Sequence, residues 1–154
     1  MIAYLALVCL AVAGPRYEVV VFLGTECPMA KLYASRLNEL AERYPQVTFR
    51  AANCSEQDSH ADVFEFGKRL RFPFAKDDGT LARELGATRS PEAFLLVKGK
   101  VVYRGRIDDL YVELGNRRYE ATTHDLRAAL DSVLEGKKPT VTTARAVGCF
   151  IPAK

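Results

Sequence analysis

The sequence has no tryptophan, only two histidines and, among its four cysteines, no pair in the Cys-x-x-Cys spacing. Zinc ligands in proteins normally come as closely spaced pairs of cysteine or histidine, so a structural zinc site is not expected. His60 and His124 lie too far apart in the chain to supply such a pair. We therefore predict that the protein holds no metal and no cofactor.

A strong charge of one sign is also missing. The 22 lysines and arginines barely exceed the 19 aspartates and glutamates, which leaves a net charge of +3. No run of five like charges occurs, and Tyr and Phe are scattered rather than grouped. Because nucleic acids and acidic membrane surfaces bind basic patches, neither is an expected partner.

No apolar run reaches the roughly 20 residues that a transmembrane helix needs. Residues 2–13 are almost wholly apolar and end in Ala11-Val12-Ala13, the small-x-small pattern of a signal-peptide cleavage site. We predict a signal peptide over residues 1–13 and export to the periplasm or another extracytoplasmic compartment. No basic residue precedes Arg16, which leaves two alternatives open: a buried N-terminal strand or helix, or a start site inside a longer signal.

The 154-residue chain, 49% apolar, is long enough for one domain. Periodicity predicts strands over residues 17–24, 47–52, 93–98 and 101–107, and helices over residues 30–44, 63–70, 80–85 and 123–135. Residues 72–74 are expected to form a further short extended segment. This alternation predicts an α/β domain over residues 14–136, with a central mixed sheet of about four to five strands and helices on both faces. Residues 108–122 are expected to form an inserted loop, and residues 137–154 an extended tail that carries Cys149.

Cys27 lies at a predicted strand-to-helix corner. It follows the apolar run of residues 17–24 and precedes Pro28, which suits the first helical position because the missing N–H of proline has no partner to lose there. Unpaired N–H groups and the dipole at a helix N-terminus favour a thiolate over a thiol. We predict that Cys27 is a reactive nucleophile rather than a small buried apolar residue.

Three segments carry a resemblance to a known family: FLGTECPMA at residues 22–30, RSPEAF at residues 89–94 and YRGRIDD at residues 103–109. With the element order, they resemble the thioredoxin fold, and more closely the redoxin branch that includes alkyl hydroperoxide reductases and thiol-specific antioxidant proteins. Exported redoxin-domain proteins of this type also end in a Gly-Cys motif, as Gly148-Cys149 does here. The resemblance implies that the Ser90-Pro91 bond is cis and that Pro91 lies beside the active cysteine.

The chain departs from this family at two places. Ala30 stands where thioredoxins carry a second cysteine, so Cys27 has no local partner. Peroxiredoxins have Thr or Ser three residues before their cysteine, whereas Gly24 stands there and Thr25 comes one residue late. Neither standard mechanism therefore transfers directly.

An oxidised Cys27 needs another thiol to resolve it. Cys54 follows the second strand, which in a parallel sheet ends at the same edge as Cys27. Cys149 lies in the tail beside Gly148, as a mobile resolving cysteine would. The alternatives are a buried thiol for Cys54 and a packing or intermolecular role for Cys149.

Five neighbouring residues are expected to contact the substrate: Thr25, Glu26, Pro28, Arg89 and Ser90. Arg89 would stabilise a thiolate at Cys27, and Glu26 would oppose it if it pointed inward, although both also fit solvent-exposed positions.

The leading prediction is an exported thiol–disulfide oxidoreductase. Cys27 would form a mixed disulfide with a disulfide-bearing protein and be released by Cys149, Cys54 or an external thiol reductant. One alternative is a thiol peroxidase that reduces peroxides, and another is a non-catalytic binding module on a thioredoxin fold.

Overall fold

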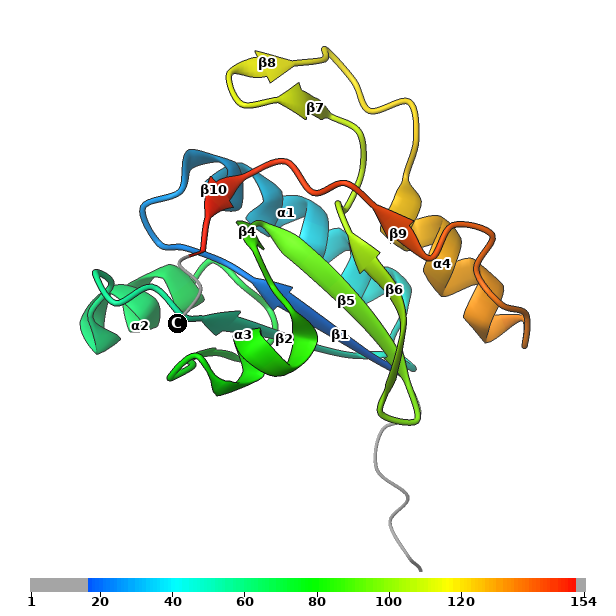
Figure 1. Ribbon diagram of the computed structural model, residues 1–154, viewed down its shortest axis with the longest axis horizontal. Coiled ribbons are helices and arrows are strands. Elements are labelled where there is room, and N and C mark those ends of the chain that lie inside the picture. Colours follow the sequence, from blue (N-terminus) through cyan, green and yellow to red (C-terminus); the bar gives the residue numbers. More distant parts are fainter. Residues whose placement is uncertain (1–16, 152–154) are drawn as a thin grey trace, which may run out of the picture.

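A computed structural model describes residues 17–151 (Figure 1). The predicted signal peptide at residues 1–13 lies outside the described residues. Within them the elements are, in chain order, β1 (Tyr17–Phe22), α1 (Pro28–Arg43), β2 (Thr48–Asn53), α2 (His60–Gly67), β3 (Phe74–Lys76), α3 (Thr80–Leu85), β4 (Arg89–Ser90), β5 (Glu92–Val97), β6 (Lys100–Gly105), β7 (Tyr111–Glu113), β8 (Asn116–Arg117), α4 (Asp125–Leu134), β9 (Thr143–Ala144) and β10 (Cys149–Phe150).

The central sheet is mixed and has the strand order β3-β2-β1-β5-β6-β9. Strand β1 pairs in parallel with β2 and antiparallel with β5. The predicted fold class is confirmed, but the sheet has six strands rather than about four to five. The additional strand is β9, because two residues are too few to show a period in the sequence. Strand β3 overlaps the predicted short extended segment at Phe74.

Strand β1 is buried on both faces, which explains its continuous apolar run. Its side chains alternate between faces, so Val19 and Val21 join the core that α1 and α4 cover. Val20 and Phe22 point to the other face and pack with residues of α3. Figure 1 shows β1 near the middle of the sheet, with α1 and α3 on opposite sides of it.

Helix α1 begins at Pro28, the residue predicted for the first helical position, and Cys27 is its N-cap residue. One side of the helix is buried against the sheet through Met29, Ala30, Tyr33, Ala34 and Leu37. Burial of this face fixes the direction in which the helix leaves the corner, and it therefore fixes the position of Cys27.

The predicted loop at residues 108–122 contains a hairpin, β7–β8, which stands away from the sheet in Figure 1. Its base is held by Asp108, which accepts hydrogen bonds from the Tyr33 hydroxyl at 2.5 Å and from Arg36 at 2.8 Å. Burial raises the pKa of Tyr33 above its ordinary value, and the hydrogen bond to Asp108 raises it further. The loop is thus anchored to α1 by side chains that the sequence pattern does not connect.

The C-terminal tail crosses the molecule from the end of α4 to the N-terminal end of α1 (Figure 1). On the way, β9 pairs in parallel with β6, and β10 then pairs antiparallel with β4. These two short strands bring Cys149 to the corner that carries Cys27.

Candidate active site

Cys27 is buried at the corner between β1 and α1. Its backbone N–H donates to the carbonyl of Gly24 at 3.3 Å, which closes a turn, and its thiol donates to the carbonyl of Ser90 at 3.3 Å. The structure therefore places the sulfur between the first turn of α1 and the backbone of β4.

A buried polar network supports the segment that precedes Cys27. Asp58, only 7% exposed, accepts hydrogen bonds from the backbone N–H of Thr25 at 2.8 Å and from the side-chain amide of Asn53 at 2.5 Å. The same amide donates to the carbonyl of Leu23 at 2.9 Å. Lys76 donates to the Asn53 carboxamide oxygen at 3.0 Å, so one cation completes the network. Two of these hydrogen bonds hold the backbone at Leu23 and Thr25, and the other two hold the side chains that make them.

Strand β4 faces Cys27 from the other side. The Ser90–Pro91 peptide bond is cis, and Pro91 is buried. The Ser90 hydroxyl accepts a hydrogen bond from the backbone N–H of Gly24 at 2.7 Å, which ties β4 to the turn before Cys27. Glu92 accepts from the backbone N–H groups of Thr88 and Arg89, at 2.7 and 3.1 Å. Both ends of β4 are therefore held by side chains.

Cys149 is the cysteine that contacts Cys27, with 2.8 Å between the two sulfur atoms. Both residues are thiols. Burial, the hydrogen bond to Cys27 and the charge of Cys27 raise the pKa of Cys149 to about 11. Cys149 consequently keeps its proton at neutral pH.

A cavity of about 470 Å³ opens beside the two sulfurs. Cys54 also lines it, so all three cysteines of the described residues border one space. The acidic residues among its lining are Glu26, Glu56, Asp58 and Asp62. No arginine or lysine of the described residues lines this cavity.

The other residues expected at the site differ in their exposure and in their contacts. Pro28 is exposed at the first position of α1. Glu26 lies at the cavity rim with its side chain 85% exposed, and it pairs with Lys31 at 3.6 Å. Thr25 is buried, and its hydroxyl has no hydrogen-bond partner. Arg89 lies over the ring of Phe150, 3.6 Å from its centroid.

Sequence reasoning missed the supporting residues Asn53, Asp58 and Lys76, and it missed Phe150. Asn53 follows an apolar strand and Asp58 lies in a polar loop, positions that give no sign of a shared network. The Arg89–Phe150 contact joins segments 61 positions apart in the numbering, so no local pattern could reveal it.

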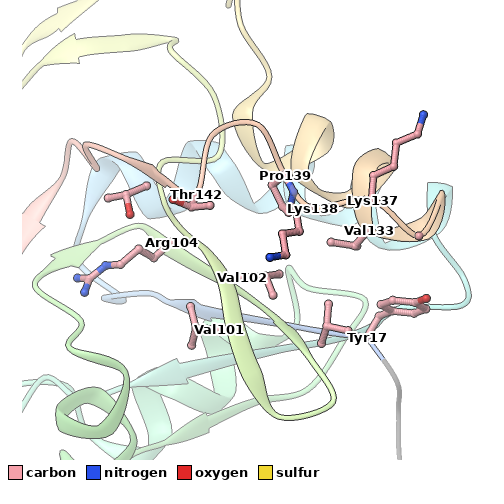
Figure 2. Close-up of a pocket in the computed structure, with 12 residues that line it drawn as sticks. Tyr17, Val101, Val102, Arg104, Val133, Lys137, Lys138, Pro139 and Thr142 are labelled. Carbon is pink, nitrogen blue, oxygen red and sulfur yellow. The ribbon is translucent and has the colours of Figure 1, made fainter.

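A separate cavity of about 560 Å³ lies between the β5–β6 hairpin, the end of α4 and the start of the tail (Figure 2). Its walls include Val97, Val101, Val102 and Val133, and it contains none of the residues predicted for the site. Figure 2 shows Lys138 lying over Val102, whereas Lys137 points away.

No helix within residues 17–151 is long and apolar enough to span a membrane. In the same part of the chain, no group of three or more His, Cys, Asp or Glu side chains is arranged to hold a metal ion.

Comparison with solved structures identifies the fold. A putative thiol:disulfide interchange protein DsbE from Chlorobium tepidum matches with a TM-score of 0.52 at 21% identity, covering 58% of this chain and 67% of that one. The fold is therefore thioredoxin-like.

Two uncharacterised proteins match over much more of the chain. The hypothetical protein SMc02350 from Sinorhizobium meliloti 1021 is 30% identical, with a TM-score of 0.77, covering 89% of this chain and 79% of that one. A conserved protein from Geobacillus kaustophilus is 28% identical, with a TM-score of 0.78, covering 91% and 78%. The chain belongs to the same family as the Sinorhizobium protein. No protein-family model matches it, and no curated protein does.

Proposed function

We propose that this protein is a thiol–disulfide oxidoreductase in which Cys27 attacks a disulfide and Cys149 resolves the product. The observation that carries the proposal is the 2.8 Å separation of the two sulfurs, from residues 122 positions apart. A disulfide bond is about 2.05 Å long, so the sulfurs need to approach by less than about 1 Å to bond.

The reaction uses two electrons from the protein. The Cys27 thiolate attacks one sulfur of a substrate disulfide, which forms a mixed disulfide and releases the other sulfur as a thiolate. The Cys149 thiolate then attacks the Cys27 sulfur, which forms the Cys27–Cys149 disulfide and releases the second substrate thiolate. An external thiol reductant returns the protein disulfide to two thiols and is itself oxidised.

The charges of the pair favour this division of roles. The sulfur of Cys27 lies at the N-terminus of α1, where the helix dipole stabilises a negative charge. Cys149, with its pKa raised to about 11, remains a thiol. Two causes of that shift are the charge of Cys27 and the hydrogen bond to it. Both disappear when Cys27 enters a mixed disulfide, so Cys149 loses its proton more easily at the step that requires its thiolate.

The comparisons add support of a general kind. A structural neighbour is named as a thiol:disulfide interchange protein, and this activity fits a disulfide-bearing protein as the substrate here. Export to an extracytoplasmic compartment belongs to the same proposal, since such compartments are oxidising.

The other predicted functions make different demands on the site. A thiol peroxidase would be favoured by an arginine near the sulfur, where its charge stabilises the thiolate, and none of the described residues that line the cavity is an arginine. Cys54 borders the same cavity and is the alternative resolving thiol. A binding module would leave Cys27 unreactive.

A trapping experiment tests the proposal. The reduced protein is mixed with one equivalent of a disulfide-linked peptide and quenched with acid, and its cysteines are mapped by mass spectrometry. We expect a Cys27–Cys149 disulfide in the wild type and in Cys54→Ser, and a stable Cys27–peptide mixed disulfide in Cys149→Ser.

Each contrary outcome identifies another function. A Cys27–Cys54 disulfide in the wild type would transfer the resolving role to Cys54. Faster oxidation of Cys27 by equimolar hydrogen peroxide than by the peptide would favour the peroxidase. An unmodified Cys27 in every sample would leave the binding module.

A further inference from the structure

The last residues of the described chain occupy the edge of β4. Strand β10 pairs antiparallel with β4, with Cys149 opposite Ser90 and Phe150 opposite Arg89. The backbone N–H of Ile151 also donates to the carbonyl of Thr88 at 3.0 Å. The edge of β4 therefore binds an extended polypeptide in a register that delivers a cysteine to Cys27.

The residue before this cysteine lies against the backbone of β4. A Cβ at Gly148 would overlap the carbonyl oxygen of Ser90 and lie 2.6 Å from its carbon. It would also lie 3.1 Å from the backbone nitrogen of Pro91. These are backbone atoms that cannot rotate away, so only glycine allows the approach.

The residue after Cys149 is an aromatic residue that contacts a positively charged side chain. Phe150 is 75% exposed, yet the Arg89 guanidinium lies 3.6 Å from its ring centroid. A cation over an aromatic face is an attractive arrangement, and arginine favours it through its planar group. The edge of β4 thus favours an aromatic residue at this position.

The backbone pairing that holds the docked tail, defined as residues 146–151, is short. Strand β10 has two residues and pairs only with β4, which itself has two. Besides this pairing, the tail is held by the partly buried side chains of Val147, Cys149 and Ile151, which pack against the core. Because the pairing is so short, the tail can leave the edge of β4 while the rest of the fold stays intact.

We propose that the docked tail is an internal stand-in for the substrate, an extended polypeptide segment with the sequence glycine, cysteine, aromatic residue. This inference rests on the proposed function, because it names the substrate class of the same cysteine pair. A substrate segment displaces the tail from β4 and presents its disulfide sulfur to Cys27. The returning tail then brings Cys149 to the mixed disulfide, and its re-pairing with β4 expels the reduced segment.

The redox state of the Cys27–Cys149 pair decides whether a substrate segment can pair with β4. In the Cys27–Cys149 disulfide the tail is covalently tied over β4, so no substrate segment can pair there. Reduction by an external thiol breaks the tie and restores the competition. The dithiol form consequently binds substrate and the disulfide form does not.

Binding of a labelled peptide measures this competition. The probe has the sequence of residues 144–152 with Cys149→Ser, so it cannot form a disulfide, and fluorescence anisotropy follows its binding to the reduced full-length protein. In the Gly148→Ala protein the tail cannot dock, and we expect the probe to bind roughly tenfold more tightly than to the wild type, because the site is no longer occupied. A probe that carries Gly148→Ala in its own sequence should not bind either protein.

Two further proteins complete the test. Gly115→Ala adds a Cβ in open space, far from β4 in the chain, and should bind the probe as the wild type does. Phe150→Ala removes only the contact with Arg89 and should bind it about threefold more tightly, which tests the inference even if Gly148→Ala does not fold.

Equal affinities in all proteins, or no binding in any of them, would overturn the inference. So would equal binding of the two probes. Because a serine peptide requires no electron transfer, these failures would leave disulfide exchange by Cys27 and Cys149 untouched. Failure of the trapping experiment, in turn, would leave peptide binding untouched.

Discussion

The two sulfurs that meet in this protein are supported by different amounts of structure. Cys27 follows a strand that pairs on both sides and begins a helix of 16 residues with a buried face. Cys149 lies in a strand of two residues, at the end of a tail that touches the central sheet through another strand of two residues.

This contrast separates two tasks. A nucleophile gains from a fixed position, because the helix terminus and the backbone around it then act on the same atom. A resolving cysteine must approach, react and withdraw so that substrate can enter, and a weakly held segment permits this. The difference in support therefore suits the exchange that we propose between Cys27 and Cys149.

The strongest test of the contrast removes the fixed sulfur. We expect Cys27→Ser to lower the rate of peptide disulfide reduction by roughly a thousandfold or more, since the bond-forming nucleophile is lost. Thiol release is followed spectrophotometrically under single-turnover conditions. Cys54→Ser is the matched control, and a rate within about twofold of wild type is expected because the proposed exchange uses Cys149, not Cys54, as the resolving thiol. A Cys27→Ser protein with normal turnover would contradict the assignment of the nucleophile.

The next largest effect comes from weakening the pairing between β9 and β6, where the tail first joins the central sheet. Gly105 has φ +135°, and a Cβ there would overlap the backbone of Ala144 in β9. We expect Gly105→Ala to lower the free energy of unfolding by roughly 2–5 kcal/mol, from left-handed strain together with overpacking. Urea denaturation measures this change, and faster alkylation of Cys149 should accompany it as β9 separates from β6.

Gly99→Ala is the control for that measurement. Gly99 also has positive φ, +78°, but a Cβ added there would meet no atom within 4 Å. Its substitution should cost only the backbone strain, about 1–3 kcal/mol, and should leave Cys149 alkylation unchanged. Equal behaviour of the two variants would show that contact with β9 is unimportant.

A smaller effect tests the support of Cys27. Asp58→Ala leaves the Thr25 N–H and the Asn53 amide without their shared acceptor, and both groups are buried. We expect the free energy of unfolding to fall by about 1–3 kcal/mol, the usual cost of an unsatisfied buried polar group. Urea denaturation checks it, and Asp58→Asn, which keeps one acceptor oxygen, should lose less. An equal loss in both variants would mean that the acceptor is not the cause.

The subtlest effect concerns the proton on Cys149. Because its pKa is raised to about 11, the thiolate is scarce below that pH, and alkylation of Cys149 should speed up steadily from pH 7 to 10. Cys27→Ala removes the hydrogen bond and the charge that contribute to the shift, so the midpoint should move down toward the ordinary thiol range. Initial rates from mass spectrometry of singly alkylated protein measure it. An unchanged midpoint would mean that burial alone raises the pKa.

Local features of the chain were predictable. The apolar run of β1, Pro28 at the start of α1 and the alternation of strands and helices each arise within a short segment, where periodicity and backbone chemistry act directly. Hence the α/β class and the placement of Cys27 at a corner could be read from the sequence. The hairpin in residues 108–122 could not, because β8 has only two residues and its base depends on Asp108 meeting side chains of α1.

The candidate site divides in the same way. The sequence by itself determined that a cysteine stands at a helix N-terminus and that a second one follows a glycine near the chain's end. Only the tertiary structure decided that these two sulfurs meet, that Gly148 lies against Ser90 and that Asp58 holds the turn before Cys27. Each of these contacts joins residues more than 30 positions apart. Such contacts form because the folded sheet brings its strand ends together. A short segment of sequence cannot show which distant residues will lie beside it.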